Sequence, residues 1–340
     1  MKISIIGGTG FLGYHTALEA LNRGHEVSSV SIPDIELGDW FPEGVNVMYR
    51  DVFKMPHDEL VSLFKGYDAM VYAVGPDDRV TPQAPAYQFF HNRLVEACTK
   101  VVRAAKDAGI KRCAVLNSYF AYFDRLWPER KLAERHSYIK CRIEQATSVI
   151  EAGGSDIAVM VLELPYIFGA MPERMPLWKD VLFDRVRRMK IVFFPGGGTN
   201  MIAVEKVAEA IVGTLERGQS GTRYLIGDVN MSYKDMLRIV LDTMGLKRRK
   251  IVTLPIIISK IVGWQMKRQE KKKGLESGLD YAYVFQDILS RELYFDPSES
   301  IEKLGYSQGG IKEAIEKTVR VCYPTIWMDE KEVNGGPDAI

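Results

Sequence analysis

The chain has 340 residues, of which 46% are hydrophobic and 26% charged, and its 45 basic and 44 acidic side chains almost cancel. This composition predicts an ordinary globular protein with a sizeable buried core, and it excludes a fibre or a disordered scaffold. The balanced charge gives no overall field that attracts nucleic acid or an anionic membrane, so a charged ligand must be met by a local site.

The cysteines and the amino-terminus predict where the protein works. The four cysteines are widely spaced, and neither a CxxC pair nor an HExxH pattern is present, so we expect no structural metal. The stretch "MKISIIGGTG" lacks the apolar core of a signal peptide, and no run reaches the roughly 18 apolar residues of a membrane span. We therefore expect a cytoplasmic protein whose partner is a small molecule, with no nucleic acid and no stable membrane insertion. Whether the protein forms a homodimer is not indicated by the sequence.

The first expected elements are a strand, a tight turn and a helix. Residues 2–6, "KISII", are a short β-branched run, and apolar side chains then recur at helical spacing from Phe11 to Leu21. Further strands are expected in "HEVSSV", "VNVMY", "AMVYAV", "CAVLN" and "IAVMVLEL", with helical patterns between most of them. This alternation predicts an α/β protein with a Rossmann-type, doubly wound parallel sheet.

The turn after the first strand, "GGTGFLG", has three glycines in the spacing G-x-x-G-x-x-G. Glycine allows a tight turn, lets the backbone approach a diphosphate, and lets the helix pack close to the sheet. The diphosphate then meets unpaired amides at the positive end of the helix dipole. A tight turn without a ligand is the alternative, but the strand before it and the helix after it favour dinucleotide binding. The expected contacts are Gly7, Thr9, Gly10, Phe11, Leu12 and Gly13.

The residue that closes the second strand indicates which nicotinamide cofactor binds. A carboxylate there holds the ribose 2′-hydroxyl and repels a 2′-phosphate. In "HEVSSVSIPD" this position is Ser31, and no acid follows until Asp34. No arginine is obviously placed to bind the phosphate either. The sequence therefore predicts NADP, with NAD as the alternative.

The alternation becomes irregular after Gly169, which predicts a smaller C-terminal substrate lobe. Residues 1–168 are the expected dinucleotide-binding domain, and residues 169–325 are mainly the lobe. The boundary is not clean, because "TRYLIGD" reads as a strand that could return to either part. Within the lobe, "SYKDMLRIVLDTMG" opens with a Ser-x-x-Asp capping signal. The last stretch, "MDEKEVNGGPDAI", is poor in apolar side chains, and residues 326–340 are expected to be a loose tail.

The segment 256–274, "IIISKIVGWQMKRQEKKKG", is apolar at its start and basic at its end. One interpretation is a helix on a membrane surface. The other is a helix that covers a substrate pocket and has a solvated basic end. The second is favoured because the apolar part is short and Pro255 is typical of an ordinary helix start.

Taken together, these motifs resemble the extended short-chain dehydrogenase/reductase family, in the branch of nucleotide-sugar epimerases, dihydroflavonol reductases and hydroxysteroid dehydrogenases. The resemblance covers roughly residues 1–320 and rests on "GGTGFLG", "RDVFK", "DAMVYAVG", "VLNSYFAY", "LPYIFG" and "FDPSESIEKLGY". It implies contacts with the adenine, along the end of the fourth strand, and around the nicotinamide. Beyond the glycine turn and Ser31, the implied cofactor residues are Asp51, Val52, Ala73, Val74, Gly75, Arg142, Pro165 and Ile167.

The resemblance also implies an active site in "HSYIKCRIEQ", residues 136–145. Tyr138 would give a proton to a carbonyl oxygen as hydride arrives from the nicotinamide, and Ser118 would orient that oxygen. One helical turn on, a cation would lower the tyrosine pKa and contact the nicotinamide ribose. This cation is Arg142, where the family nearly always has lysine. Arginine keeps the charge, but it releases no proton and its planar fork differs from an ammonium.

Two further positions depart from the family pattern: Leu94 stands where asparagine is usual, and Glu163 where arginine is usual. Tyr138 could therefore instead be an ordinary aromatic residue on a helix surface, with a cationic neighbour four positions later and no catalytic role. The serine and the glycine turn, at the right distances in sequence, favour an active site.

The sequence predicts an NAD(P)-dependent reductase or dehydrogenase of a small to medium, partly apolar carbonyl or alcohol. Aromatic residues on the substrate side favour such a ligand over a highly phosphorylated one. One alternative is a sugar-nucleotide epimerase or dehydratase, in which the cofactor cycles internally. Another is a cofactor-binding sensor or partner protein without catalysis. The expected substrate contacts are Phe120, Tyr122, Trp127 and Tyr166.

Overall fold

The computed structural model describes residues 1–33 and 36–324. Asp34 and the tail expected at 326–340 lie outside the described residues. At the centre is a seven-stranded sheet with the strand order β10-β6-β5-β4-β1-β2-β3. Its strands are β1 (Lys2–Ile6), β2 (Glu26–Ser31), β3 (Val45–Tyr49), β4 (Ala69–Tyr72), β5 (Arg112–Ser118), β6 (Ala158–Leu164) and β10 (Arg223–Leu225).

All neighbouring strands of this sheet are parallel. The order reverses between β1 and β4, and in a doubly wound sheet ligands bind at the carboxyl ends of the strands beside such a point. This arrangement confirms the predicted fold class.

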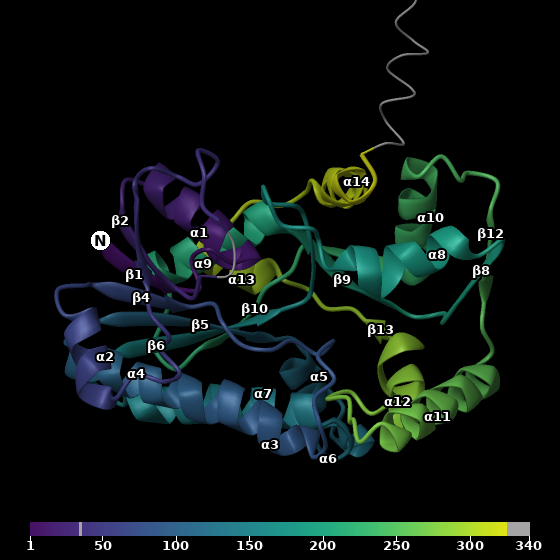
Figure 1. Cartoon of the computed structure of the whole chain (residues 1–340), viewed down its shortest axis with the longest axis horizontal. Helices are drawn as coiled ribbons and strands as arrows, with labels where there is room; N and C mark the ends of the chain where they lie inside the picture. The colour runs from purple at the N-terminus through teal and green to yellow at the C-terminus, as the bar shows by residue number, and fades with distance from the viewer. Residues whose placement is uncertain (34–35, 325–340) are drawn as a thin grey trace, which may run out of the picture.

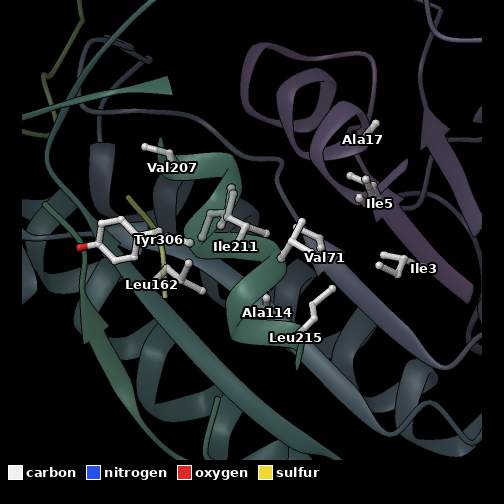
Figure 2. Packing of buried hydrophobic residues seen from close by; sticks show 14 of the residues in the cluster. Ile3, Ile5, Ala17, Val71, Ala114, Leu162, Val207, Ile211, Leu215 and Tyr306 are labelled. Atoms are coloured by element: carbon white, nitrogen blue, oxygen red, sulfur yellow. The ribbon is translucent and has the colours of Figure 1, made fainter. Parts of the chain in front are cut away.

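Helices cover both faces of the sheet (Figure 1). One layer holds α1 (Phe11–Asn22), α9 (Val204–Arg217) and α13 (Ser298–Leu304). The other holds α2 (His57–Phe64), α3 (Ala86–Phe90), η1 (His91–Glu96), α4 (Ala97–Asp107) and α7 (Ser137–Gly153). Figure 2 shows Val207, Ile211 and Leu215 of α9 packed beside Val71 and Ala114 of the sheet. The strands are therefore buried on both faces, which is why they read as continuous apolar runs.

The chain beyond Gly169 contributes to both parts of the molecule, since β10, α9 and α13 join the large sheet. Two short sheets build the rest. The first contains β7 (Tyr166–Phe168), β9 (Gly198–Ala203), β11 (Val229–Ser232) and β13 (Glu292–Leu293), and the second pairs β8 (Ile191–Phe194) with β12 (Lys250–Thr253).

The remaining helices lie beside the short sheets and at the edge of the large sheet. They are α5 (Phe120–Leu126), η2 (Pro128–Arg130), α6 (Leu132–Arg135), η3 (Lys179–Phe183), α8 (Asp184–Arg188), α10 (Tyr233–Thr243), α11 (Ile256–Lys272), α12 (Tyr281–Val284), η4 (Phe285–Leu289) and α14 (Ile311–Cys322). Within the described residues, no helix is both long and apolar enough to cross a membrane.

Candidate active site

The glycine turn joins β1 to α1 at the crevice of the sheet. Gly7 has φ +88°, and its amide donates to the carbonyl oxygen of Val30 at 2.8 Å. A Cβ on Gly7 would lie 2.5 Å from Cγ1 of Val74, and one on Gly13 would overlap the carbonyl oxygen of Gly7. A Cβ on Gly10 would meet only that same oxygen, at 3.2 Å. The fold thus requires Gly7 and Gly13, whereas Gly10 borders a space that the protein itself does not fill.

This space fits the diphosphate of a dinucleotide. Helix α1 begins directly after Gly10, and no side chain caps that end among the described residues. Its first amides and the positive end of its dipole are therefore available to an anion. Phe11 and Leu12 form the first turn, and the amide of Thr9 is held by the Ser31 hydroxyl at 3.3 Å.

The end of β2 adjoins the backbone of Arg50, a basic residue that sequence reasoning missed and whose guanidinium donates to the Tyr49 carbonyl at 2.8 Å. The Ser31 hydroxyl lies 2.9 Å from that of Ser29, so it is held inside the turn. Arg50 follows β3, its amide donates to the carbonyl oxygen of Ser31 at 2.9 Å, and its side chain is exposed. The pairing of β2 with β3 brings Arg50 to this place, and no motif in the sequence marks that pairing.

The predicted adenine residues follow Arg50. Val52 is buried in the core, and the Asp51 carboxylate accepts from the amide of Phe53 at 3.1 Å and pairs with Lys54 at 3.2 Å. Asp51 therefore shapes its own turn next to the end of β3.

The end of β4 and the segment after β6 both approach the glycine turn. The Ala73 amide donates to the carbonyl oxygen of Ile6 at 3.0 Å, which places Val74 and Gly75 beside the turn. A Cβ on Gly169 would lie 3.5 Å from Cζ of Phe11. The stretch from Pro165 through Ile167 to this glycine thus returns to the start of α1, and Trp178 Nε1 donates to the Ile167 carbonyl at 2.8 Å.

Helix α7 places Tyr138 and Arg142 together on one face. Arg142 Nε donates to the Tyr138 hydroxyl at 2.9 Å, and the guanidinium carbon lies 5.0 Å from the centre of the tyrosine ring. Both residues are buried, with exposed fractions of 3% and 8%. Because the phenol oxygen accepts this bond, its own proton is free to go to another acceptor.

The other nitrogens of Arg142 are held by protein acceptors. Nη1 donates to Oε1 of Gln145 at 2.9 Å and to the Leu116 carbonyl at 3.3 Å, and Nη2 donates to the Pro76 carbonyl at 3.4 Å. The planar fork is thereby fixed between α7, β5 and the loop after β4. This network accommodates arginine where lysine is usual.

Ser118 is connected to Arg142 through Asn117. The Asn117 side-chain amide donates to the Arg142 carbonyl at 2.9 Å and to Gln145 Oε1 at 3.0 Å, and its oxygen accepts from the Ser118 amide at 2.6 Å. The Ser118 hydroxyl accepts from the Phe120 amide at 3.4 Å. Sequence reasoning missed Asn117 and Gln145. The spacing of Gln145, one turn beyond Arg142 on the same helical face, is the signal that could have revealed it.

The pKa of Tyr138 is above its usual range because the hydroxyl is buried. The charge and hydrogen bond of Arg142 act in the opposite direction, and the carboxylates of Asp78 and Asp77 raise the pKa further. At neutral pH Tyr138 is therefore protonated, which is the state required of a proton donor.

Aromatic side chains enclose Tyr138. The ring centres of Phe90 and Phe120 lie 5.4 Å and 6.5 Å from that of Tyr138, both edge to face. Tyr166 belongs to the same group of rings, since its ring centre lies 6.5 Å from that of Tyr119. We call Phe90, Tyr119, Phe120, Tyr138 and Tyr166 the aromatic wall. The structure thus brings the predicted contacts Phe120 and Tyr166 to the site.

Two other predicted substrate residues lie further along α5. Tyr122 packs on Phe295, with ring centres 6.1 Å apart, and Trp127 packs on Phe123 at 4.7 Å beneath Arg130. The structure does not bring Trp127 or Tyr122 into ring contact with Tyr138.

Asp78, in the loop after β4, affects the pKa values of two tyrosines near the candidate site, and no sequence pattern indicated it. Burial raises the pKa of Tyr166 to about 12, and the nearby carboxylate of Asp78 contributes, as it does at Tyr138. Burial also raises the pKa of Asp78 itself. Arg79 pairs with Asp77 and lies 5.8 Å over the ring of Trp178. Asp78 therefore adds an acidic group to the substrate side.

The two remaining departures from the family pattern have local explanations. Leu94 is buried, and its Cδ2 would lie 2.8 Å from a Cβ on Gly75, so an apolar contact occupies the asparagine position. Glu163 is buried at the end of β6, and its two oxygens accept from Arg125 at 2.8 Å and 2.7 Å. The buried carboxylate is thus paired.

Comparison with known proteins agrees with this geometry. Residues 7–165 match a family model described as NAD(P)H-binding. The chain is 22% identical to a putative dihydroflavonol 4-reductase of Synechocystis sp., covering 93% of this chain and 92% of that protein. It is 23% identical to the decarboxylating sterol-4-alpha-carboxylate 3-dehydrogenase of Mus musculus, covering 62% of this chain and 58% of that protein.

Solved structures share the fold. That of gox2253 has a TM-score of 0.75 at 18% identity and covers 94% of this chain and 97% of its own. A UDP-galactose 4-epimerase has a TM-score of 0.68 at 17% identity, with 96% and 100% covered. Residues 7–165 thus match an NAD(P)H-binding unit, the chain shares the fold of these structures over almost its whole length, and its relatives indicate an NAD(P)-dependent enzyme.

Proposed function

We propose that this enzyme reduces the carbonyl group of a small to medium, partly apolar molecule, with NADP preferred to NAD as its cofactor. The observation that carries the proposal is the state of Tyr138. Its oxygen accepts from Arg142 at 2.9 Å, and burial keeps its pKa high, so it holds a proton available for transfer at neutral pH. The bound reduced cofactor supplies the hydride.

The residues around Tyr138 have complementary roles in this reaction. Tyr138 gives its proton to the carbonyl oxygen, and Ser118, at the end of β5, donates a hydrogen bond that orients that oxygen. Arg142 stabilises the phenolate that remains, because its Nε is already within hydrogen-bonding distance. Phe90 and Phe120 exclude water from the hydroxyl.

The substrate side supports a neutral molecule over a sugar nucleotide. The carboxylate of Asp78 raises the pKa of both Tyr138 and Tyr166, and a negative charge near these tyrosines disfavours a phosphate group beside them. The names of the Synechocystis and mouse relatives, a reductase and a dehydrogenase, also support this reaction class.

A screen of carbonyl compounds and sugar nucleotides tests the proposed function. We expect one NADPH to be consumed for each alcohol formed, with the loss of NADPH followed by absorbance. Interconversion of a sugar nucleotide without net consumption of NADPH would instead identify an epimerase. Tight cofactor binding without turnover of either class would identify a sensor protein.

Replacing Ser31 should change the cofactor preference. In Ser31→Asp the new carboxylate can still accept from the Thr9 amide, but it repels the 2′-phosphate and can hold a ribose hydroxyl. We expect the ratio of kcat/KM for NADPH to kcat/KM for NADH to fall by about 10- to 100-fold. This change corresponds to the free energy of one hydrogen bond to a charged group. Arg50→Ala should weaken NADPH binding and leave NADH binding unchanged. A wild-type enzyme that already prefers NADH contradicts the NADP assignment.

The positive charge of Arg142 is expected to support both turnover and cofactor binding. We expect Arg142→Met to lower turnover by about tenfold or more, and to weaken cofactor binding, because the cation that stabilises the phenolate is lost. Without that cation the pKa of Tyr138 rises further, so oxidation of the alcohol, which needs the phenolate, shifts to higher pH. Arg142→Lys restores the usual family cation and should retain activity. A pH–rate profile of the three proteins checks this, and an unchanged rate and profile in Arg142→Met would exclude the proposed role.

A further inference from the structure

Helix α11 lies at the outer edge of the molecule (Figure 1), and several of its apolar side chains are exposed to the solvent. Its buried residues are Ser259 and Gly263, and a Cβ on Gly263 would overlap the backbone of α12. The helix therefore packs through a narrow strip of small residues. Ile257, Ile261 and Trp264, at successive turns of its outer face, are 70%, 54% and 57% exposed. An ordinary surface helix has the reverse arrangement, with its apolar side buried.

The strands β8 and β12, at the same end of the molecule as α11, also have exposed apolar side chains. Val252 of β12 pairs with Phe193 of β8, and both side chains are exposed, as is Ile191 two residues earlier. Figure 1 places β8, β12 and α11 at one end of the molecule, away from the amino-terminal strand. We call this surface the apolar edge: Ile191, Phe193, Val252, Ile257, Ile261 and Trp264. A surface of this extent marks an interaction site.

Basic side chains surround the apolar edge. The segment 246–273 contains ten basic residues and a single acid, Glu270, in a chain whose total charge is balanced. Arg268 lies over the ring of Trp264, with 5.6 Å between the guanidinium carbon and the ring centre. Lys190, Lys250, Lys260, Lys271 and Lys272 are exposed beside the same elements. The partner of this surface is therefore apolar and negatively charged at once.

A cavity of about 440 Å³ adjoins the first turn of α11 and strengthens this charge argument. Arg130, Arg135, Lys260 and Arg291 contribute four cations to its lining, against one carboxylate, Asp287. Asp287 is already paired with Arg135 at 2.9 Å. Across the described part of the chain, Lys260 and Arg291 form no ion pair, so the cavity retains net positive charge.

We propose that α11 and the apolar edge dock this enzyme on the surface of an anionic phospholipid bilayer, with a lipid phosphate bound in the basic cavity. In this arrangement Ile257, Ile261 and Trp264 enter the headgroup region, and the basic side chains bind the surrounding phosphates. Charge complementarity selects the bilayer over a second copy of the chain, because pairing two such edges would bring like charges together. The proposal adopts the membrane-surface interpretation of segment 256–274 in place of the pocket cover that the sequence favoured.

Helix α11 packs on α12 and η4, whose Val284 and Ile288 belong to the same buried cluster as Tyr138. These two short helices therefore lie between the proposed membrane face and the cluster around Tyr138. The docking proposal concerns different residues from the proposed reaction, so either can fail while the other holds.

Co-sedimentation of the full chain with vesicles tests the proposal. We expect binding to vesicles of phosphatidylcholine mixed with phosphatidylglycerol, and little binding to phosphatidylcholine alone. The variant Ile257→Asp/Trp264→Asp should lower the affinity by at least about tenfold, and so should Lys260→Glu/Arg268→Glu. The matched control is Lys65→Glu/Lys111→Glu, which reverses two exposed lysines after α2 and before β5 and should leave vesicle binding unchanged. NADPH affinity, equal in all variants, verifies that each is folded.

Three results would overturn the proposal. The first is no binding to either vesicle type. The second is a stable dimer that Ile257→Asp/Trp264→Asp converts to monomer without any vesicle binding, which would make the apolar edge a subunit interface. The third is binding of glycerol phosphate to the cavity in a protein that ignores vesicles, which would make the cavity a site for a soluble anion.

Discussion

Replacement of Tyr138 by phenylalanine is expected to slow carbonyl reduction by about 100-fold or more while leaving cofactor affinity nearly unchanged. The substitution removes the hydroxyl that holds the transferable proton and keeps the ring, which packs between Phe90 and Phe120. Single-turnover rates give the loss in the chemical step, and a titration with NADPH gives the affinity.

A second tyrosine of the same cluster provides the control. The Tyr119 hydroxyl lies 2.7 Å from that of Thr199 and is remote from Arg142 in the hydrogen-bond network, so Tyr119→Phe removes a buried hydroxyl without removing the proposed donor. We expect this variant to retain most of the rate. If Tyr138→Phe reduced a carbonyl as fast as the wild type, the active-site assignment of α7 would have to be abandoned.

Gly10→Val is expected to abolish measurable binding of both NADPH and NADH with little loss of fold. The valine side chain would occupy the space before the first turn of α1, where the diphosphate is expected to lie. A Cβ there meets a single neighbour, the carbonyl oxygen of Gly7 at 3.2 Å, so the substitution requires a small local shift and not the backbone overlap that a Cβ on Gly13 would cause. Calorimetric titration measures the binding, and thermal unfolding followed by circular dichroism verifies the fold.

The neighbouring glycine distinguishes a ligand effect from a folding effect. A Cβ on Gly13 would overlap the backbone of Gly7, so Gly13→Ala should lower thermal stability as well as binding. Gly10→Val should change only the binding. An unchanged NADPH affinity in folded Gly10→Val would contradict the placement of the cofactor at this turn.

The fold was predictable because its signals are local. Strands such as β1 and β6 are buried on both faces, so they read as unbroken apolar runs whatever their partners are. The start of α10 was equally readable, since the Ser232 hydroxyl accepts from the Asp235 amide at 3.0 Å, as the capping signal predicts. The spacing of Tyr138 and Arg142 also survives in the structure, because both positions lie on one helix.

The rest of the candidate site depends on contacts between distant segments. Asp78 lies in a loop without periodicity, and its effect on the pKa of Tyr166, 88 positions later, depends on the tertiary fold. The acceptors of Arg142 include backbone oxygens of Leu116 and Pro76, which have no sequence signature. The orientation of α11 was equally hidden, because its composition is the same whichever face packs inward. The close contact of Gly263 with α12 shows which face of α11 packs inward.

Transfer of deuteride from NADPH labelled at the transferring carbon tests the central claim most directly. With an accepted carbonyl substrate, the account predicts one deuterium on the carbinol carbon of the product for each cofactor oxidised. It also predicts formation of that product about 100-fold or more slowly in Tyr138→Phe at unchanged cofactor affinity. A label that returns to the cofactor with no net oxidation, or an equal rate of transfer in Tyr138→Phe, would contradict it.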